Sequence, residues 1–173
     1  MGLAPQLRGI PKPVIAAVNG VAAGAGRGIA LASDIRLASE SARFTSVFVK
    51  RSLVPDAGVS EILIALSGPG IAAEMSFTGR VYDAPWALSK GLVNAVIPDD
   101  ELTAQAEAMA QEIAANAPQA VKAIKGLFNV HHTSLNKVIL AEHRANDPLR
   151  GTNDQTEAIQ AFLEKRLPKF TGS

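Results

Sequence analysis

A glycine-rich segment after an apolar run constrains the fold of this chain more than any other feature. It occupies residues 12–39 and reads KPVIAAVNG followed by VAAGAGRGIALASDIRLAS. The apolar residues at 14–18 do not alternate with polar ones, which predicts a fully buried strand. Three glycines then precede a run of small residues, which predicts a tight turn into a helix that starts near Gly28 and ends near Ser33.

The rest of the chain alternates short apolar runs with helical patterns, which predicts an α/β fold. We expect a core in residues 1–98 and a helical region in residues 99–173, because the later patterns have helical periodicity. Extended segments are expected at residues 35–38, 43–49 and 92–97, and helices at 59–66, 71–77, 84–90, 99–116, 118–131, 134–146 and 152–167.

Composition excludes several classes of protein. The chain has 173 residues, 47% of them hydrophobic, which suits one domain with a full core. The formal net charge of +1 argues against nucleic acid as a partner. The absence of cysteine excludes disulfides and thiolate chemistry and fits the cytoplasm. No apolar run reaches the length of a membrane span, so no membrane partner is expected.

Three interpretations of the glycine-rich segment compete. The segment could bind a dinucleotide through a G-x-G-x-x-G motif. The third glycine of that motif would fall at Ile29, however, so the match is poor. The small residues could simply permit close packing. The third interpretation is an oxyanion hole, because backbone N–H groups at a helix start have no intrahelical acceptor and can hold negative charge on a carbonyl oxygen.

Asp56 is the candidate acid–base group. It lies in the sequence PDAG, just before a predicted helix. One interpretation is that its carboxylate caps that helix, because Asp is common at helix N-termini. The other is that it moves a proton during catalysis.

Three separated stretches resemble the crotonase superfamily, which is the enoyl-CoA hydratase/isomerase family. They are the glycine-rich segment continued to ARF, then FTGRVYDAPWALSKGLVNAVIPDDEL, and finally AFLEKRLPKF. The resemblance implies a spiral of β-β-α turns, here partial, followed by a helical oligomerisation region. It further implies acyl-CoA thioester substrates and assembly into homotrimers or dimers of trimers.

The resemblance also implies how a thioester enolate is stabilised. One family donor lies on the central residue of the glycine segment, which matches the backbone N–H of Ala25. The other family donor lies in turns upstream of KPVIAAVNG. We therefore expect that this chain lacks the N-terminal part of the domain.

The acid–base positions differ from those of the hydratases in the family. Their two glutamates match Gly28 and Phe48, which offer no general acid or base. Asp56 matches the single carboxylate of a subset that includes some isomerases and dehalogenases.

Further residues are expected to bind the substrate. Gly24, Gly26, Arg27 and Phe48 surround the predicted site, although a solvated surface position for Arg27 is an equal alternative. Phe162 and Lys165 match positions that contact CoA in relatives, with a charged helix face as the alternative. No cofactor is expected apart from CoA as part of the substrate. His131, His132 and His143 lack metal-binding spacing, so no metal is expected.

These features favour an enoyl-CoA isomerase that uses Asp56 and the Ala25 N–H. One alternative is a hydratase-like member with weak activity. Another is a truncated, non-catalytic protein that binds acyl-CoA or only assembles. The presence of Asp56 favours the enzyme, whereas the missing upstream donor, Gly28 and Phe48 favour the non-catalytic alternative.

Overall fold

The structure is a computed structural model that describes residues 3–130 and 135–171, so His131 and His132 lie outside the described residues. Its strands are β1 (Ile15–Val18), β2 (Val21–Ala22), β3 (Ile35–Ser39), β4 (Arg43–Thr45), β5 (Val81–Asp83) and β6 (Ala95–Ile97). Its helices are α1 (Leu3–Gly9), α2 (Gly24–Ala32), α3 (Val59–Thr78), α4 (Ala84–Ser89), α5 (Leu102–Ala114), α6 (Pro118–Val130), α7 (Leu135–Asn146) and α8 (Asn153–Leu163), with 3-10 turns η1 (Val47–Arg51) and η2 (Asp147–Leu149).

Two small sheets frame α2. The first has the order β1-β3-β6 with parallel neighbours, and it aligns Ile15 with Ile35 and Leu37 with Ala95. The second has the order β2-β4-β5, with β2 parallel and β5 antiparallel to β4. Because β1 and β3 are parallel neighbours, the chain crosses over between them, and α2 lies within that connection.

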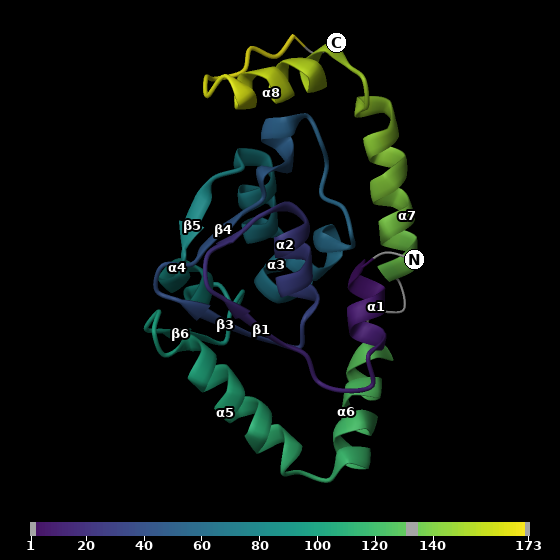
Figure 1. Cartoon of the computed structure of the whole chain (residues 1–173). Helices are drawn as coiled ribbons and strands as arrows, with labels where there is room; N and C mark the ends of the chain where they lie inside the picture. Colours follow the sequence, from purple (N-terminus) through teal and green to yellow (C-terminus); the bar gives the residue numbers. More distant parts are fainter. Residues whose placement is uncertain (1–2, 131–134, 172–173) are drawn as a thin grey trace.

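The apolar core lies where α2, α3 and β4 meet. Leu31, Phe44, Ile62, Leu63 and Met75 are each no more than 1% exposed. The four C-terminal helices α5 to α8 run around the periphery of this core (Figure 1). None of the helices that the structure describes is both long and apolar enough to cross a membrane.

A largely buried ion pair fastens α6 to the core. The Lys125 ammonium donates to Asp34 Oδ2 at 2.8 Å and to the Lys12 carbonyl at 2.7 Å. The same Asp34 oxygen accepts from the Val14 amide at 2.7 Å. One carboxylate therefore joins the chain before β1, the start of β3 and a helix that is remote in sequence.

Several predicted elements differ in extent. The 14–18 strand is half-buried rather than fully buried, because β1 is the edge strand of its sheet and Ala17 is exposed. The helix expected near Gly28 begins earlier, at Gly24, whose φ of +49° is readily adopted by glycine. The extended segment 43–49 stops at Thr45, where the chain turns into η1.

The predicted break at residues 67–70 is confirmed. Gly68 has φ +78° and ψ 163°, which are not helical values, and Pro69 follows it. Only glycine adopts that region easily, and proline cannot donate the helical hydrogen bond. Helix α3 is therefore two segments joined by a kink.

Candidate active site

The N-terminus of α2 presents unpaired backbone donors. Ala23 precedes the helix in an extended conformation, and the Arg27 amide donates to the Ala23 carbonyl at 3.3 Å. The amides of the first helical turn that precede this bond have no intrahelical acceptor. Ala25 and Gly26 are exposed. Ala25, the residue of the predicted donor, therefore lies at the surface of the protein.

A hollow of about 330 Å³ adjoins this helix start. It lies between β1, β2 and α2, and its lining includes Gly20, Gly26 and Ile29. Arg27 and Asp56 do not line it. The predicted residues thus occupy two sides of the α2 N-terminus, with Gly26 at the hollow and Arg27 in the interior.

Asp56 lies in the loop before α3 and is half-buried. The helix-capping position is taken by Gly58, without a side-chain cap hydrogen bond. Asp56 contributes its backbone carbonyl, which accepts from the Val59 amide at 3.0 Å. Helix capping by the Asp56 side chain is therefore not what the structure shows.

The loop that carries Asp56 packs directly on α2. A Cβ atom added at Gly28 would lie 3.5 Å from Val59 Cγ2 and 3.7 Å from Ala57 Cβ. Ala57 has φ +56°, a left-handed conformation that costs a non-glycine residue free energy. The contacts at Gly28 bring the loop that carries Asp56 against α2, and Asp56 lies close enough to Arg27 for its charge to act on that guanidinium.

Arg27 is buried, so the solvated alternative is wrong. Only 1% of the residue is exposed, and its Nη2 donates to Ser46 Oγ at 3.0 Å. The guanidinium carbon lies 5.7 Å from the centroid of the Phe48 ring. Burial lowers the pKa of Arg27 to about 10, and the nearby Asp56 charge acts in the opposite direction. The side chain is therefore a protonated cation at neutral pH.

Turn η1 connects the predicted residues of the core with those of α8. Phe48 is 7% exposed and faces Arg27, whereas Arg51 extends toward α8. The Arg51 guanidinium lies 4.2 Å from the centroid of the Phe162 ring, which is within cation–π range. Phe162 itself remains 60% exposed.

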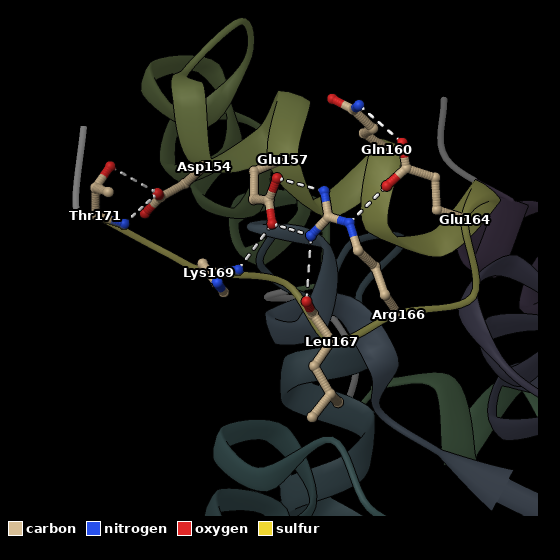
Figure 2. Close-up of polar contacts among 8 residues, drawn as sticks. All are labelled: Asp154, Glu157, Gln160, Glu164, Arg166, Leu167, Lys169 and Thr171. Carbon is tan, nitrogen blue, oxygen red and sulfur yellow. Dashed lines mark hydrogen bonds and ion pairs between the residues drawn. The ribbon is translucent and has the colours of Figure 1, made fainter.

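The segment after α8 folds back along the helix (Figure 2). Glu157 accepts from the Arg166 guanidinium and from the Lys169 amide, and Asp154 accepts from the Thr171 amide. Lys165 is exposed, with φ +54°, at the turn between helix and segment. Phe162 and Lys165 are thus both exposed near the end of α8, whereas Arg27 and the Phe48 ring beside it are buried.

Sequence reasoning missed two residues that build this site. Ser46 is fully buried and anchors Arg27, and its hydroxyl also donates to Ser76 Oγ at 3.4 Å. Ser46 lies at a turn, where serine is common, and Ser76 lies within α3, so nothing in the sequence singled these residues out. Among the residues that the structure describes, no cluster of metal-ligating side chains occurs.

Comparisons with known proteins identify the family of this chain. The sequence model of a family described as enoyl-CoA hydratase/isomerase matches residues 2–173. The short-chain-enoyl-CoA hydratase of Clostridium acetobutylicum is 40% identical over 162 residues, which are 93% of this chain and 62% of that protein. The 1,2-epoxyphenylacetyl-CoA isomerase of Escherichia coli is 37% identical over 168 residues, which are 96% of this chain and 64% of that protein.

A solved structure shares the fold. The crystal structure of an enoyl-CoA hydratase from Mycobacterium avium subsp. paratuberculosis has a TM-score of 0.94 at 35% identity, covering 98% of this chain and 69% of that one. The expected α/β crotonase-like fold is therefore confirmed. The chain spans 62% and 64% of the two curated relatives named above.

Proposed function

The chain belongs to the enoyl-CoA hydratase/isomerase family, and from that membership we propose that it acts on acyl-CoA thioesters as an isomerase. Relatives that carry hydratase names and isomerase names resemble this chain to similar extents. The preference for isomerisation rests instead on one observation. The loop that carries Asp56 packs on α2 at Gly28, whereas Gly28 and Phe48, the positions matched to the hydratase glutamates, are not carboxylates.

Isomerisation of a 3-enoyl thioester needs one base. Asp56 takes a proton from C2, and the electron pair of that C–H bond forms the C1–C2 double bond of an enolate. The negative charge of the enolate intermediate rests on the thioester oxygen, near the Ala25 N–H. The same carboxyl group then returns the proton at C4, where the C3–C4 π pair forms the new C–H bond, the C1–C2 pair becomes the C2–C3 double bond of the product, and the thioester carbonyl re-forms. Addition of water would need further acid–base groups in this site.

The test is a pair of assays on the chain. The first follows the ultraviolet absorbance of the conjugated product after addition of a 3-enoyl-CoA, and the second follows loss of that absorbance from a 2-enoyl-CoA. The D56N variant keeps the shape of the side chain and removes the base, so isomerase turnover should fall by about 10²- to 10⁴-fold. D100N, at an exposed aspartate, is the matched control.

The outcomes separate the candidate functions. Isomerase turnover that D56N abolishes and D100N retains supports the proposal. Faster hydration than isomerisation favours the hydratase-like alternative. No turnover of either substrate, with acyl-CoA still bound, favours the non-catalytic alternative.

Assembly is a separate part of the proposal. We propose that the chain forms homotrimers or dimers of trimers through its helical region. Large apolar side chains are exposed on three of those helices: Ile124, Leu127 and Phe128 on α6, Leu140 on α7, and Ile159, Phe162 and Leu163 on α8. Exposed apolar surface of this kind marks interaction sites. Light scattering that gives the mass of a monomer would contradict the assembly.

A further inference from the structure

Arg27 carries a buried charge that the chain compensates only in part. Its Nε and Nη1 atoms are inaccessible to solvent, and neither has a hydrogen-bond partner in the part of the chain that the structure describes. Within the same described residues, no ion pair joins Arg27 to a carboxylate. Buried charges are normally paired, so an unpaired guanidinium requires an explanation.

The guanidinium of Arg27 is fixed in position by its contacts. Its Nη2 donates to Ser46 at 3.0 Å, and its carbon lies 5.7 Å from the centre of the Phe48 ring. Its backbone belongs to the first turn of α2, two residues after the Ala25 donor. A fixed cation at this position contributes to the electrostatic potential at the helix N-terminus whatever the conformation of the ligand.

The same location is next to the proposed base. The loop of Asp56 contacts α2 at Gly28, the residue after Arg27. A carboxylate base and an enolate would together bring negative charge to this region. A cation there compensates that charge and so lowers the free energy of the enolate. The attraction is stronger than in bulk water, because the surroundings of the buried guanidinium have a lower effective dielectric constant.

We propose that the buried Arg27 guanidinium stabilises the anionic enolate of a thioester bound at the α2 N-terminus. It acts by its fixed charge, in addition to the backbone N–H of Ala25. The ligand class is an acyl-CoA whose α-carbon loses a proton. This inference rests on the proposed function, because it concerns the intermediate of that reaction.

The probe is acetoacetyl-CoA, because it reports enolate formation without turnover. Loss of its α-proton to the buffer leaves the electron pair delocalised over the keto and thioester oxygens, and this enolate absorbs in the near ultraviolet. Titration of the protein with the probe therefore measures the affinity for the enolate form. The measurement needs no catalytic proton transfer to C4.

Four variants define the experiment. R27M removes the charge and keeps an unbranched apolar side chain of similar volume, and R27K keeps the charge. R36M removes another buried arginine, whose hydrogen bonds go to the Leu92 and Ser33 carbonyls. D56N, combined with R27M, shows whether Arg27 acts through the carboxylate, because a double-mutant cycle isolates their coupling. Circular dichroism verifies folding, and R27Q replaces R27M should R27M not fold.

We expect R27M to weaken enolate binding by at least about tenfold, which is below the loss of about 10²- to 10³-fold for deletion of a directly bonded oxyanion donor. The same loss should appear in the D56N background, and R27K and R36M should keep most of the binding. Equal binding by R27M and the unmutated chain overturns the inference. A loss that disappears in the D56N background, or an equal loss in R36M, also overturns it.

Enolate formation by the unmutated chain separates failure of the proposed function from failure of the role of Arg27. If the unmutated chain forms no enolate from bound acetoacetyl-CoA, both the isomerase proposal and the role of Arg27 are wrong. If it forms the enolate and R27M does so equally well, the isomerase proposal stands and the role of Arg27 is wrong.

Discussion

The guanidinium of Arg27 lies against the ring of Phe48, 5.7 Å from its centroid. The family resemblance matches Phe48 and Gly28 to the two glutamates that hold water in hydratases. Neither residue carries a carboxylate, so the charge beside the Phe48 ring is the cation of Arg27. Under the isomerase proposal, this cation favours an anionic intermediate.

The R27M variant should be at least as stable as the unmutated chain. The guanidinium is buried with two unpaired nitrogens, and replacing buried ionic groups by apolar ones of similar volume often raises stability by about 1–4 kcal/mol. Urea denaturation measures the free energy of unfolding. A decrease of more than about 1 kcal/mol would mean that Arg27 is mainly a structural residue.

The G28A variant should stabilise the chain by about 0.5–1 kcal/mol, because alanine is the better helix former. The added Cβ would make ordinary contacts, at 3.5 Å to Val59 and 3.7 Å to Ala57. Thermal unfolding measures the change. The contrasting variant is G79A, where φ is +57° and Lys50 atoms lie 3.1 Å from the added Cβ. G79A should destabilise by about 1 kcal/mol or more, and equal effects of the two variants would contradict the predicted contrast.

The K125M variant should lower the free energy of unfolding by about 3 kcal/mol, because it leaves the partly buried Asp34 without its cation. Chemical denaturation of the purified variant measures the loss. K122M is the matched control, since Lys122 is exposed on the same helix and should change stability by no more than about 0.5 kcal/mol. Similar losses in both variants would show that the ion pair is not the cause.

The fold-back of the C-terminal segment should weaken in acid. Hydrogen bonds from Arg166, then from the Lys169 amide, lower the pKa of Glu157 from 4.5 to about 2. A lowered pKa means that the ionised carboxylate stabilises the folded segment. The contribution is complete above pH 4.5 and is lost as pH falls toward 2.

The backbone amide resonance of Lys169 follows this transition by NMR. In the E157Q variant the resonance should already have its acid-like position at neutral pH and should lose the titration between pH 4.5 and 2. An unchanged titration in E157Q would mean that another carboxylate controls the segment. Asp154, which accepts from Thr171, is then the group to test next.

The sequence alone determined the order of elements and the family. Glycine and proline mark local backbone geometry, so the kink at Gly68 and the turn into α2 could be predicted. Apolar periodicity identified the helical C-terminal region. These features depend on neighbours within a few positions along the chain, which a sequence displays directly.

Only the tertiary structure decided where Arg27 lies. The local sequence does not distinguish a solvated from a buried side chain at this position. The partners of Arg27, Ser46 and Phe48, are distant along the chain and contact it only when β4 and η1 pack over α2. The position of Asp56 likewise depends on the contact between its loop and Gly28. Burial and charge compensation arise from contacts between remote segments, and single-residue patterns do not encode them.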